Sequence, residues 1–187
     1  MNGKIIVCAL FLFIFFSCKS EKKKTVIENN FDFASKQLVF AVDEIEKAKA
    51  TESEEDEAKR KIRNQGPLVS PRTMDKNGKL VLVTSEDWTS GFFAGGLWYM
   101  YEYFKTPEWE NFAREYTAPL EREKLNGNTH DMGFKMYCSY GNGYRLTQDE
   151  NYKKILMESA YTLISRYKPK AKIIRSWTIM LTNGNVR

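Results

Sequence analysis

The sequence is poor in histidine, cysteine and proline: its 187 residues include one histidine, three cysteines and five prolines. No set of Cys and His residues has the spacing of metal ligands, so no metal site is expected. Cys8 and Cys18 lie near the N-terminus, which leaves Cys138 as the one other thiol, and a single thiol forms no internal disulfide. No stretch resembles a phosphate-binding loop, and no cofactor is expected.

Long runs of charged residues of one sign are also scarce. The chain has 29 basic and 24 acidic residues, a net charge of +5, and the two signs are interspersed. The excess is partly local, at Lys19 and at residues 22–24. No helix face combines a basic stripe with interleaved aromatic residues, so nucleic acid is not expected as a partner.

The N-terminus has the pattern of a secretory signal. Lys4 is followed by the apolar run IIVCALFLFIFF and then by SCKS. The run is shorter than the roughly 20 apolar residues of a membrane span. The ending FFSC resembles a bacterial lipobox, which would make Cys18 the lipidated first residue of a protein anchored in the bacterial cell envelope. An uncleaved signal, or cleavage elsewhere, is the alternative.

Most of the remaining chain has helical periodicity. Residues 19–30 are polar and predict a tether. From Phe31 a helix is expected to run into a solvated charged end at 52–60, with one apolar face formed by Leu38, Val39, Val42 and Ile45. Pro and Gly in residues 64–88 predict a loop or a short strand pair. Residues 90–104 are apolar nearly all round, which indicates a buried helix.

Three further helices are expected. Thr106 and Pro107 are a good start for one that runs to about Lys124. Another begins near His130 and stops at the GNG of 141–143, and Thr147 with Glu150 predicts a capping box for the last. The apolar stripe of the first of these helices consists of Trp109, Phe112, Ala113, Tyr116 and Leu120. That of the last consists of Tyr152, Ile155, Leu156, Ala160, Leu163 and Ile164. Residues 168–172 read as a linker. The expected fold is all-α, in antiparallel pairs.

Four motifs carry a resemblance to a known family. DWTSGFFAGGLWYMYEY, THDMGF, CSYGNGYRLT and IRSW resemble, in order and spacing, glycoside hydrolase family 88, the unsaturated glucuronyl hydrolases. The similarity extends over residues 31–177. It implies an (α/α)6 toroid, of which this chain would form roughly the first half. It also implies a substrate, the unsaturated uronate oligosaccharides that polysaccharide lyases leave, and a reaction that hydrates their C4=C5 enol ether.

The resemblance assigns roles to four residues. Asp131 matches one of the family's two active-site aspartates, and His130 matches a residue that lines the uronate site. Trp88 and Trp177 match aromatic residues that flank the sugar. The residues alone permit other interpretations: Asp131 as a helix N-cap, His130 as a surface or capping residue, Trp88 as a core aromatic. Gly91, Gly95 and Gly96 are expected to be helix-packing glycines.

The tail departs from the family. Thr178 stands where family members have an aspartate, and the family's principal catalytic aspartate would lie beyond Arg187. A set of codons that encodes residues 177–187 also encodes Trp-Asp-His-Asn-Ala-Asp when one nucleotide is inserted after the Trp177 codon. That peptide resembles the segment that family members have at this place. A frameshift is therefore expected, with residues 178–187 aberrant and this chain poorly folded and inactive; resequencing past the Trp177 codon tests it. A non-catalytic glycan-binding lipoprotein and a decayed gene fragment are the alternatives.

Overall fold

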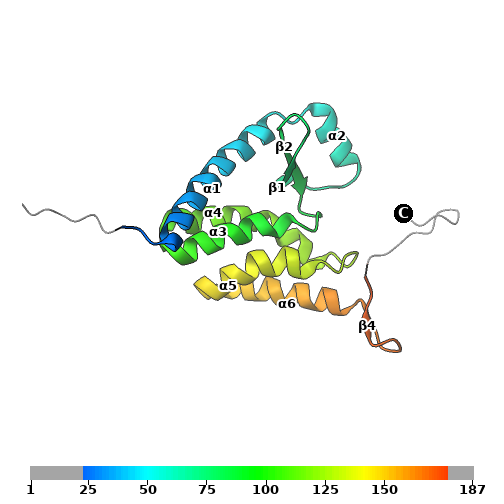
Figure 1. Ribbon diagram of the computed structural model, residues 1–187. Helices are drawn as coiled ribbons and strands as arrows, with labels where there is room; N and C mark the ends of the chain where they lie inside the picture. Colours follow the sequence, from blue (N-terminus) through cyan, green and yellow to red (C-terminus); the bar gives the residue numbers. More distant parts are fainter. Residues whose placement is uncertain (1–22, 177–187) are drawn as a thin grey trace, which may run out of the picture.

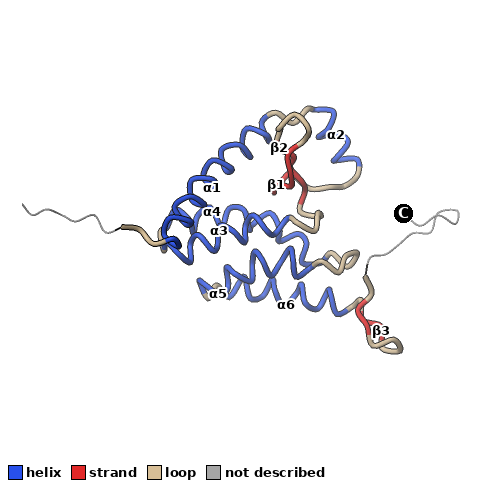
Figure 2. Tube along the Cα trace, viewed as in Figure 1, coloured by secondary structure: helices blue, strands red, loops and turns tan. Residues whose placement is uncertain are grey.

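Helices make up most of residues 23–176, the part of the chain that the computed structural model describes (Figures 1 and 2). The expectation of a mainly helical chain is confirmed. The α-helices are α1 (Val26–Ala50), α2 (Glu54–Ile62), α3 (Ser90–Phe104), α4 (Pro107–Thr117), α5 (Asn142–Thr147) and α6 (Glu150–Ile164). A 3-10 segment, η1 (Ala118–Leu125), follows α4, and a π-helical segment, η2 (Gly133–Gly141), precedes α5. None of the described helices has the length and apolar character needed to cross a membrane.

Helix α1 begins earlier than expected, within the stretch assigned to the tether. Thr25 caps it: its hydroxyl accepts from the Glu28 amide at 3.2 Å, and the Glu28 carboxylate accepts from the Thr25 amide at 2.6 Å. The helix ends at Ala50, so the charged stretch that follows is a separate helix, α2, capped by Ser53. That stretch is solvated as predicted, with i,i+4 ion pairs such as Lys59 with Glu55 on its surface.

The predicted strand pair is present. Strands β1 (Leu68–Met74) and β2 (Leu80–Thr84) form an antiparallel hairpin next to α1 and α2 (Figure 2). The register shifts between Pro71 and Thr73, as expected where a proline has no N–H for the ladder. A second, two-residue pair, β3 (Tyr167–Lys168) with β4 (Ile173–Ile174), encloses the predicted linker after α6.

Helices α3 and α4 form an antiparallel hairpin around Trp98, which is fully buried. The indole N–H of Trp98 donates to the Thr117 hydroxyl at 2.9 Å, and the rings of Phe104 and Trp109 stack near the connection. The predicted helix to about Lys124 is α-helical only to Thr117. Pro119 lies in the first turn of the 3-10 segment that continues it, because proline has no N–H for an α-helical bond.

The second helical hairpin, in which η2 and α5 pack against α6, differs from two boundary predictions. The GNG of residues 141–143 does not stop a helix, because η2 continues directly into α5, which ends at Thr147 and is followed by Gln148 in the left-handed conformation. Gly143 is buried, and a Cβ there would lie 2.5 Å from the Tyr152 ring and 2.9 Å from that of Trp98, so this glycine permits close packing. Asp149, not Thr147, caps α6: its carboxylate accepts from the Asn151 amide.

Helix α3 and η2 pack in parallel at backbone contact. A Cβ at Gly91 would overlap the carbonyl oxygens of Phe134 and Lys135, and one at Gly95 would lie 2.8 Å from that of Cys138. Since the contacts advance along both segments in the same direction, their N-terminal ends lie at the same end of the molecule. Gly96 has open space beside it, so its prediction as a packing glycine is wrong.

The core lies between the two hairpins and α1. The predicted stripe of α4 and η1 is buried, Phe112 only partly, and Tyr152 and Ile155 of α6 are buried as expected. Three of the four α1 residues also face the core, Ile45 fully. Val39 and Ile164 are 44% and 58% exposed, and Ala160 is exposed as well, so the assignment of these three residues to apolar core faces is wrong. Val39 and Ile164 each lie at the border of a stripe, where periodicity alone gives no partner.

Replacing Gly91 by Ala is expected to lower the free energy of unfolding by about 1–3 kcal/mol. The reason is that the backbone carbonyls of Phe134 and Lys135 cannot move aside as a side chain can. Gly96→Ala, on the same helix, is the matched control and is expected to raise it by roughly 0.5–1 kcal/mol. Urea unfolding of both variants measures the difference. Equal stabilities would contradict the close parallel packing.

Candidate functional site

Trp88 lies in the turn that leads from β2 into α3. The Asp87 carboxylate organises this turn: it accepts from the Thr89 amide at 2.8 Å and from the Thr89 hydroxyl at 2.6 Å. Arg72 of β1 donates to the same carboxylate at 3.2 Å and places its guanidinium 5.5 Å from the Trp88 ring. The Trp88 side chain is 43% exposed, so its interpretation as a core aromatic is wrong.

Trp88 belongs to an exposed cluster of three rings, which we call the aromatic platform: Trp88, Phe92 and Phe134. Each pair of ring centroids is 5.7 Å apart in an edge-to-face arrangement. All three are more than two-fifths exposed. Sequence reasoning missed Phe92, because an α3 sequence that is apolar all round does not reveal which ring faces outward. It also missed Phe134 of η2, whose place beside Trp88 depends on the packing of two distant segments.

His130 and Asp131 form a turn before η2. The Asp131 residue is 7% exposed, and its Oδ2 accepts from the Thr129 hydroxyl at 3.2 Å. The same hydroxyl accepts from the Asp131 amide at 3.0 Å, and Nε2 of His130 lies 3.5 Å from Asp131 Oδ1. Met132 precedes η2 and makes no side-chain bond, while the Asp131 carbonyl accepts from the Lys135 amide at 3.2 Å, so Asp131 stands at the start of the helical segment. Its carboxylate is held in the turn by the Thr129 hydroxyl.

The chain after α6 returns to this turn. The Arg166 guanidinium donates to the carbonyl oxygens of Gly127 and Arg175. The Ser176 hydroxyl then lies 3.4 Å from Nδ1 of His130. Trp177, the next residue, lies outside the described residues, as does Cys18, so the predictions for both stand untested by the structure.

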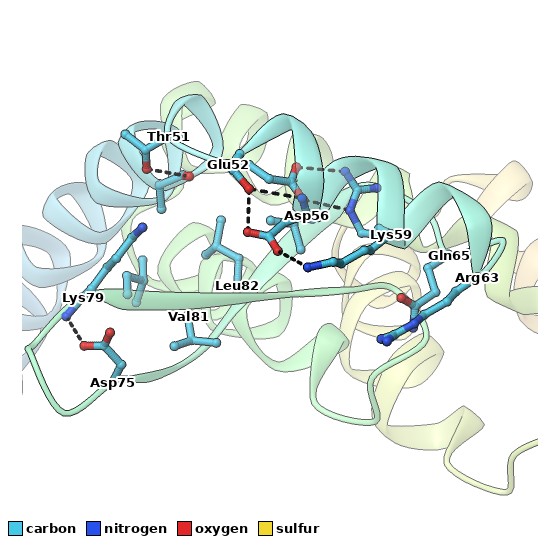
Figure 3. A pocket seen from close by; sticks show the side chains of 15 residues that line it. Thr51, Glu52, Asp56, Lys59, Arg63, Gln65, Asp75, Lys79, Val81 and Leu82 are labelled. Carbon is cyan, nitrogen blue, oxygen red and sulfur yellow. Dashed lines mark hydrogen bonds and ion pairs between the residues drawn. The ribbon is translucent and has the colours of Figure 1, made fainter.

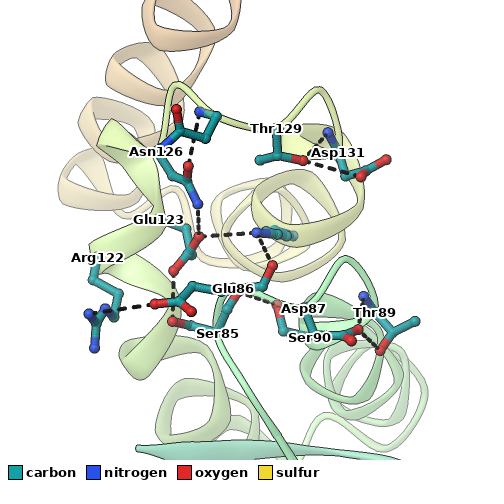
Figure 4. Close-up of polar contacts among 12 residues, drawn as sticks. Ser85, Glu86, Asp87, Thr89, Ser90, Arg122, Glu123, Asn126, Thr129 and Asp131 are labelled. Carbon is teal, nitrogen blue, oxygen red and sulfur yellow. Dashed lines mark hydrogen bonds and ion pairs between the residues drawn. The ribbon is translucent and has the colours of Figure 1, made fainter. Parts of the chain in front are cut away.

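Parallel packing brings the two predicted motifs together. Because α3 and η2 start at the same end, the Trp88 turn and the His130–Asp131 turn are neighbours, and Phe134 of the second motif packs directly on Trp88. Figure 4 shows both turns with the polar residues between them. Within residues 23–176, no group of three His, Cys, Asp or Glu side chains could hold a metal ion.

A buried polar network lies behind the two turns. Lys135 and Glu123 are 0% and 2% exposed, and their Nζ and Oε2 atoms are 3.1 Å apart. Glu123 also accepts from Ser85 and from Asn126, each at 2.7 Å (Figure 4). Burial raises the pKa of Glu123, but the Asn126 bond, the Lys135 charge and the Ser85 bond together lower the pKa below its ordinary value.

A cavity of about 590 Å³ lies elsewhere, between the α1–α2 corner and the β1–β2 hairpin (Figure 3). Its wall includes Glu52, in the connection between the two helices, and Arg60 of α2, which form an ion pair at 2.9 Å. Asp56, Lys59 and Asp75 add charges of both signs. None of the predicted site residues lines this cavity, so the candidate site is the open end formed by the two turns.

The architecture defines the class of protein. Two parallel segments, α3 and η2–α5, are each followed by an antiparallel partner, which is the repeating unit of an (α/α)6 toroid, and the described chain forms part of one. No protein-family model matches the chain. An unsaturated glucuronyl hydrolase from Formosa agariphila is 47% identical over 109 residues, which are 57% of this chain and 27% of that protein.

Solved structures of unsaturated glucuronyl hydrolases also match this chain. The crystal structure of an unsaturated glucuronyl hydrolase specific for heparin matches with a TM-score of 0.60 and 34% identity, over 81% of this chain and 38% of that one. A UGL variant solved with dGlcA-Glc-Rha-Glc has a TM-score of 0.55 and 28% identity, over 64% and 32%. The chain is thus related to the unsaturated glucuronyl hydrolases, glycoside hydrolase family 88, and spans 27–38% of the length of these relatives.

The lowered pKa of Glu123 makes its stabilising effect depend on pH. A carboxyl with a lowered pKa in the folded state stabilises above its unfolded pKa, about 4.5, and loses the effect as pH falls through the folded pKa. The difference in free energy of unfolding between wild type and Glu123→Gln is therefore expected to shrink below about pH 4.5. Urea unfolding across this range measures it; a constant or growing difference would refute the account.

Proposed function

We propose that the protein hydrolyses unsaturated uronic acids from the ends of lyase-generated oligosaccharides, and that the described residues supply one wall of its cleft. The observation that carries the proposal is the meeting of the aromatic platform and a 7% exposed aspartate at one end of two parallel helices. The relatives named above act on such sugars by name. Because the chain spans 27–38% of their length, the activity is proposed for the whole protein.

The platform suits one face of a pyranose. Flat apolar rings pack against the C–H face of a sugar, while a few polar groups fix its hydroxyls and carboxylate. Trp88 offers such a ring, and Arg72 lies 5.5 Å from it with a positive charge. The proposed reaction adds a proton to C4 and water to C5 of the enol ether, and the resulting hemiketal opens and releases the sugar.

Asp131 is proposed as a charged, supporting carboxylate in this reaction. The Thr129 hydroxyl donates to its Oδ2, and the His130 ring nitrogen lies 3.5 Å from its Oδ1, so neighbours on both sides fix the direction of the carboxylate. In this orientation it positions a hydroxyl of the sugar or the attacking water by accepting its hydrogen.

Asp131→Asn is expected to lower kcat by at least about 10²-fold while KM changes little, since the amide keeps the size and loses the charge. Loss of the ultraviolet absorbance of the C4=C5 double bond measures the reaction on a lyase-derived disaccharide. Asp43→Asn, on the solvent side of α1, is the matched control and should leave kcat unchanged. Equal kcat in Asp131→Asn and wild type would remove Asp131 from the mechanism.

A second candidate function is glycan binding without hydrolysis, which the exposed platform supports by itself. Binding of the disaccharide with no loss of absorbance would favour it. In either case Trp88→Ala is expected to weaken binding roughly tenfold, the value of one good aromatic contact.

We also propose that a lipid on Cys18 anchors the protein in a bacterial cell envelope, as the FFSC pattern indicates. Cys18→Ser is expected to move the protein from the detergent phase to the aqueous phase on phase separation, and Cys8→Ser, the control, is not. Retention of Cys18→Ser in the detergent phase would contradict the anchor.

A further inference from the structure

Lys135 connects the main chains of both motifs. Its backbone amide donates to the Asp131 carbonyl at 3.2 Å, in the first turn of η2. Its Nζ donates to the Glu86 carbonyl at 2.6 Å, two residues before Trp88. One fully buried residue thus bonds to the turn that carries the aspartate and to the turn that carries the platform.

Glu123 completes the connection from η1. It pairs with Lys135 Nζ at 3.1 Å and accepts from the Ser85 hydroxyl at 2.7 Å. The Ser90 hydroxyl in turn donates to the Ser85 carbonyl at 2.9 Å. The Trp88 turn is therefore held at Ser85, Glu86 and Ser90 by buried bonds (Figure 4).

Stability alone does not explain this arrangement. Burying two charges costs desolvation, and apolar side chains of similar volume often stabilise a core as well or better. An apolar side chain at position 135 could not bond to the Glu86 carbonyl. The charged pair therefore specifies where the turn lies, which packing of apolar groups would leave loose.

We propose that Lys135 and Glu123 are positioning residues that fix Trp88 relative to Asp131. Lys135 holds the Glu86 carbonyl, and Glu123 holds Lys135 in the one orientation that reaches it. The role in sugar binding rests on the proposed function; the placement of the Trp88 turn does not.

The test uses the full chain labelled with fluorotryptophan, with the Trp88 fluorine resonance assigned from Trp88→Phe. Lys135→Met leaves Glu123 buried without its cation, so the melting temperature should fall by at least about 5 °C. Lys135→Met/Glu123→Gln removes both charges and should recover most of that loss. The Trp88 resonance should nevertheless be shifted or broadened in both variants, because neither has a donor for Glu86.

Two controls separate positioning from stability. Lys153→Met, on the surface of α6, should change neither the melting temperature nor the Trp88 resonance. Glu123→Gln keeps Lys135, so its Trp88 resonance should move less than that of Lys135→Met. If the double variant does not fold, Lys135→Met/Glu123→Met, which also lacks a donor for the Glu86 carbonyl, replaces it.

An unchanged Trp88 resonance in a folded double variant would overturn the proposal and make the pair merely structural. The sugar separates this outcome from the proposed function. If wild type binds the unsaturated disaccharide, the double variant should bind at least about fivefold more weakly, and an unchanged affinity would also count against positioning. If wild type shows no binding, the described part of the cleft does not hold the sugar by itself, and the fluorine spectrum alone decides the placement of Trp88.

Discussion

Backbone contact between α3 and η2 is the constraint on which the rest of the described structure depends. Gly91 and Gly95 let the two segments approach until a side chain would overlap the opposite carbonyls. Because the segments run in parallel, both of their leading turns reach the same end. One turn leads into the aromatic platform and the other carries the His130–Asp131 pair, so the backbone packing of α3 on η2 decides which of these residues meet.

The two turns at this end of the molecule also explain why the charged pair Lys135–Glu123 is buried there. Turns at helix starts leave main-chain groups without helical partners, and buried polar groups need partners of their own. The Lys135–Glu123 pair satisfies a carbonyl of one turn and a hydroxyl of its neighbour, and it leaves the rings of the platform facing outward. The matched portion is 27–38% of the length of the relatives.

Much of the fold could be predicted from the sequence, and the failures have physical causes. The helices, the β-hairpin and the exposure of α2 follow from the spacing of apolar residues and from the positions of Pro, Gly and charged residues. Glycine permits chain reversal, so the GNG predicts a helix stop, whereas tertiary packing requires Gly143 to make room for Trp98 and Tyr152. Trp88, His130 and Asp131 came from a resemblance between motifs. Phe92 and the Lys135–Glu123 pair could not be found, because burial and facing direction depend on contacts between distant segments.

The most direct measurement is a titration of the isotopically labelled chain with an unsaturated uronic acid disaccharide, followed by amide chemical shifts. The account predicts that amides of residues 85–92 and 129–137 shift together, with those of residues 52–63 at the α1–α2 corner unchanged. No shift in the first two segments, or shifts confined to the corner, would contradict the placement of the site.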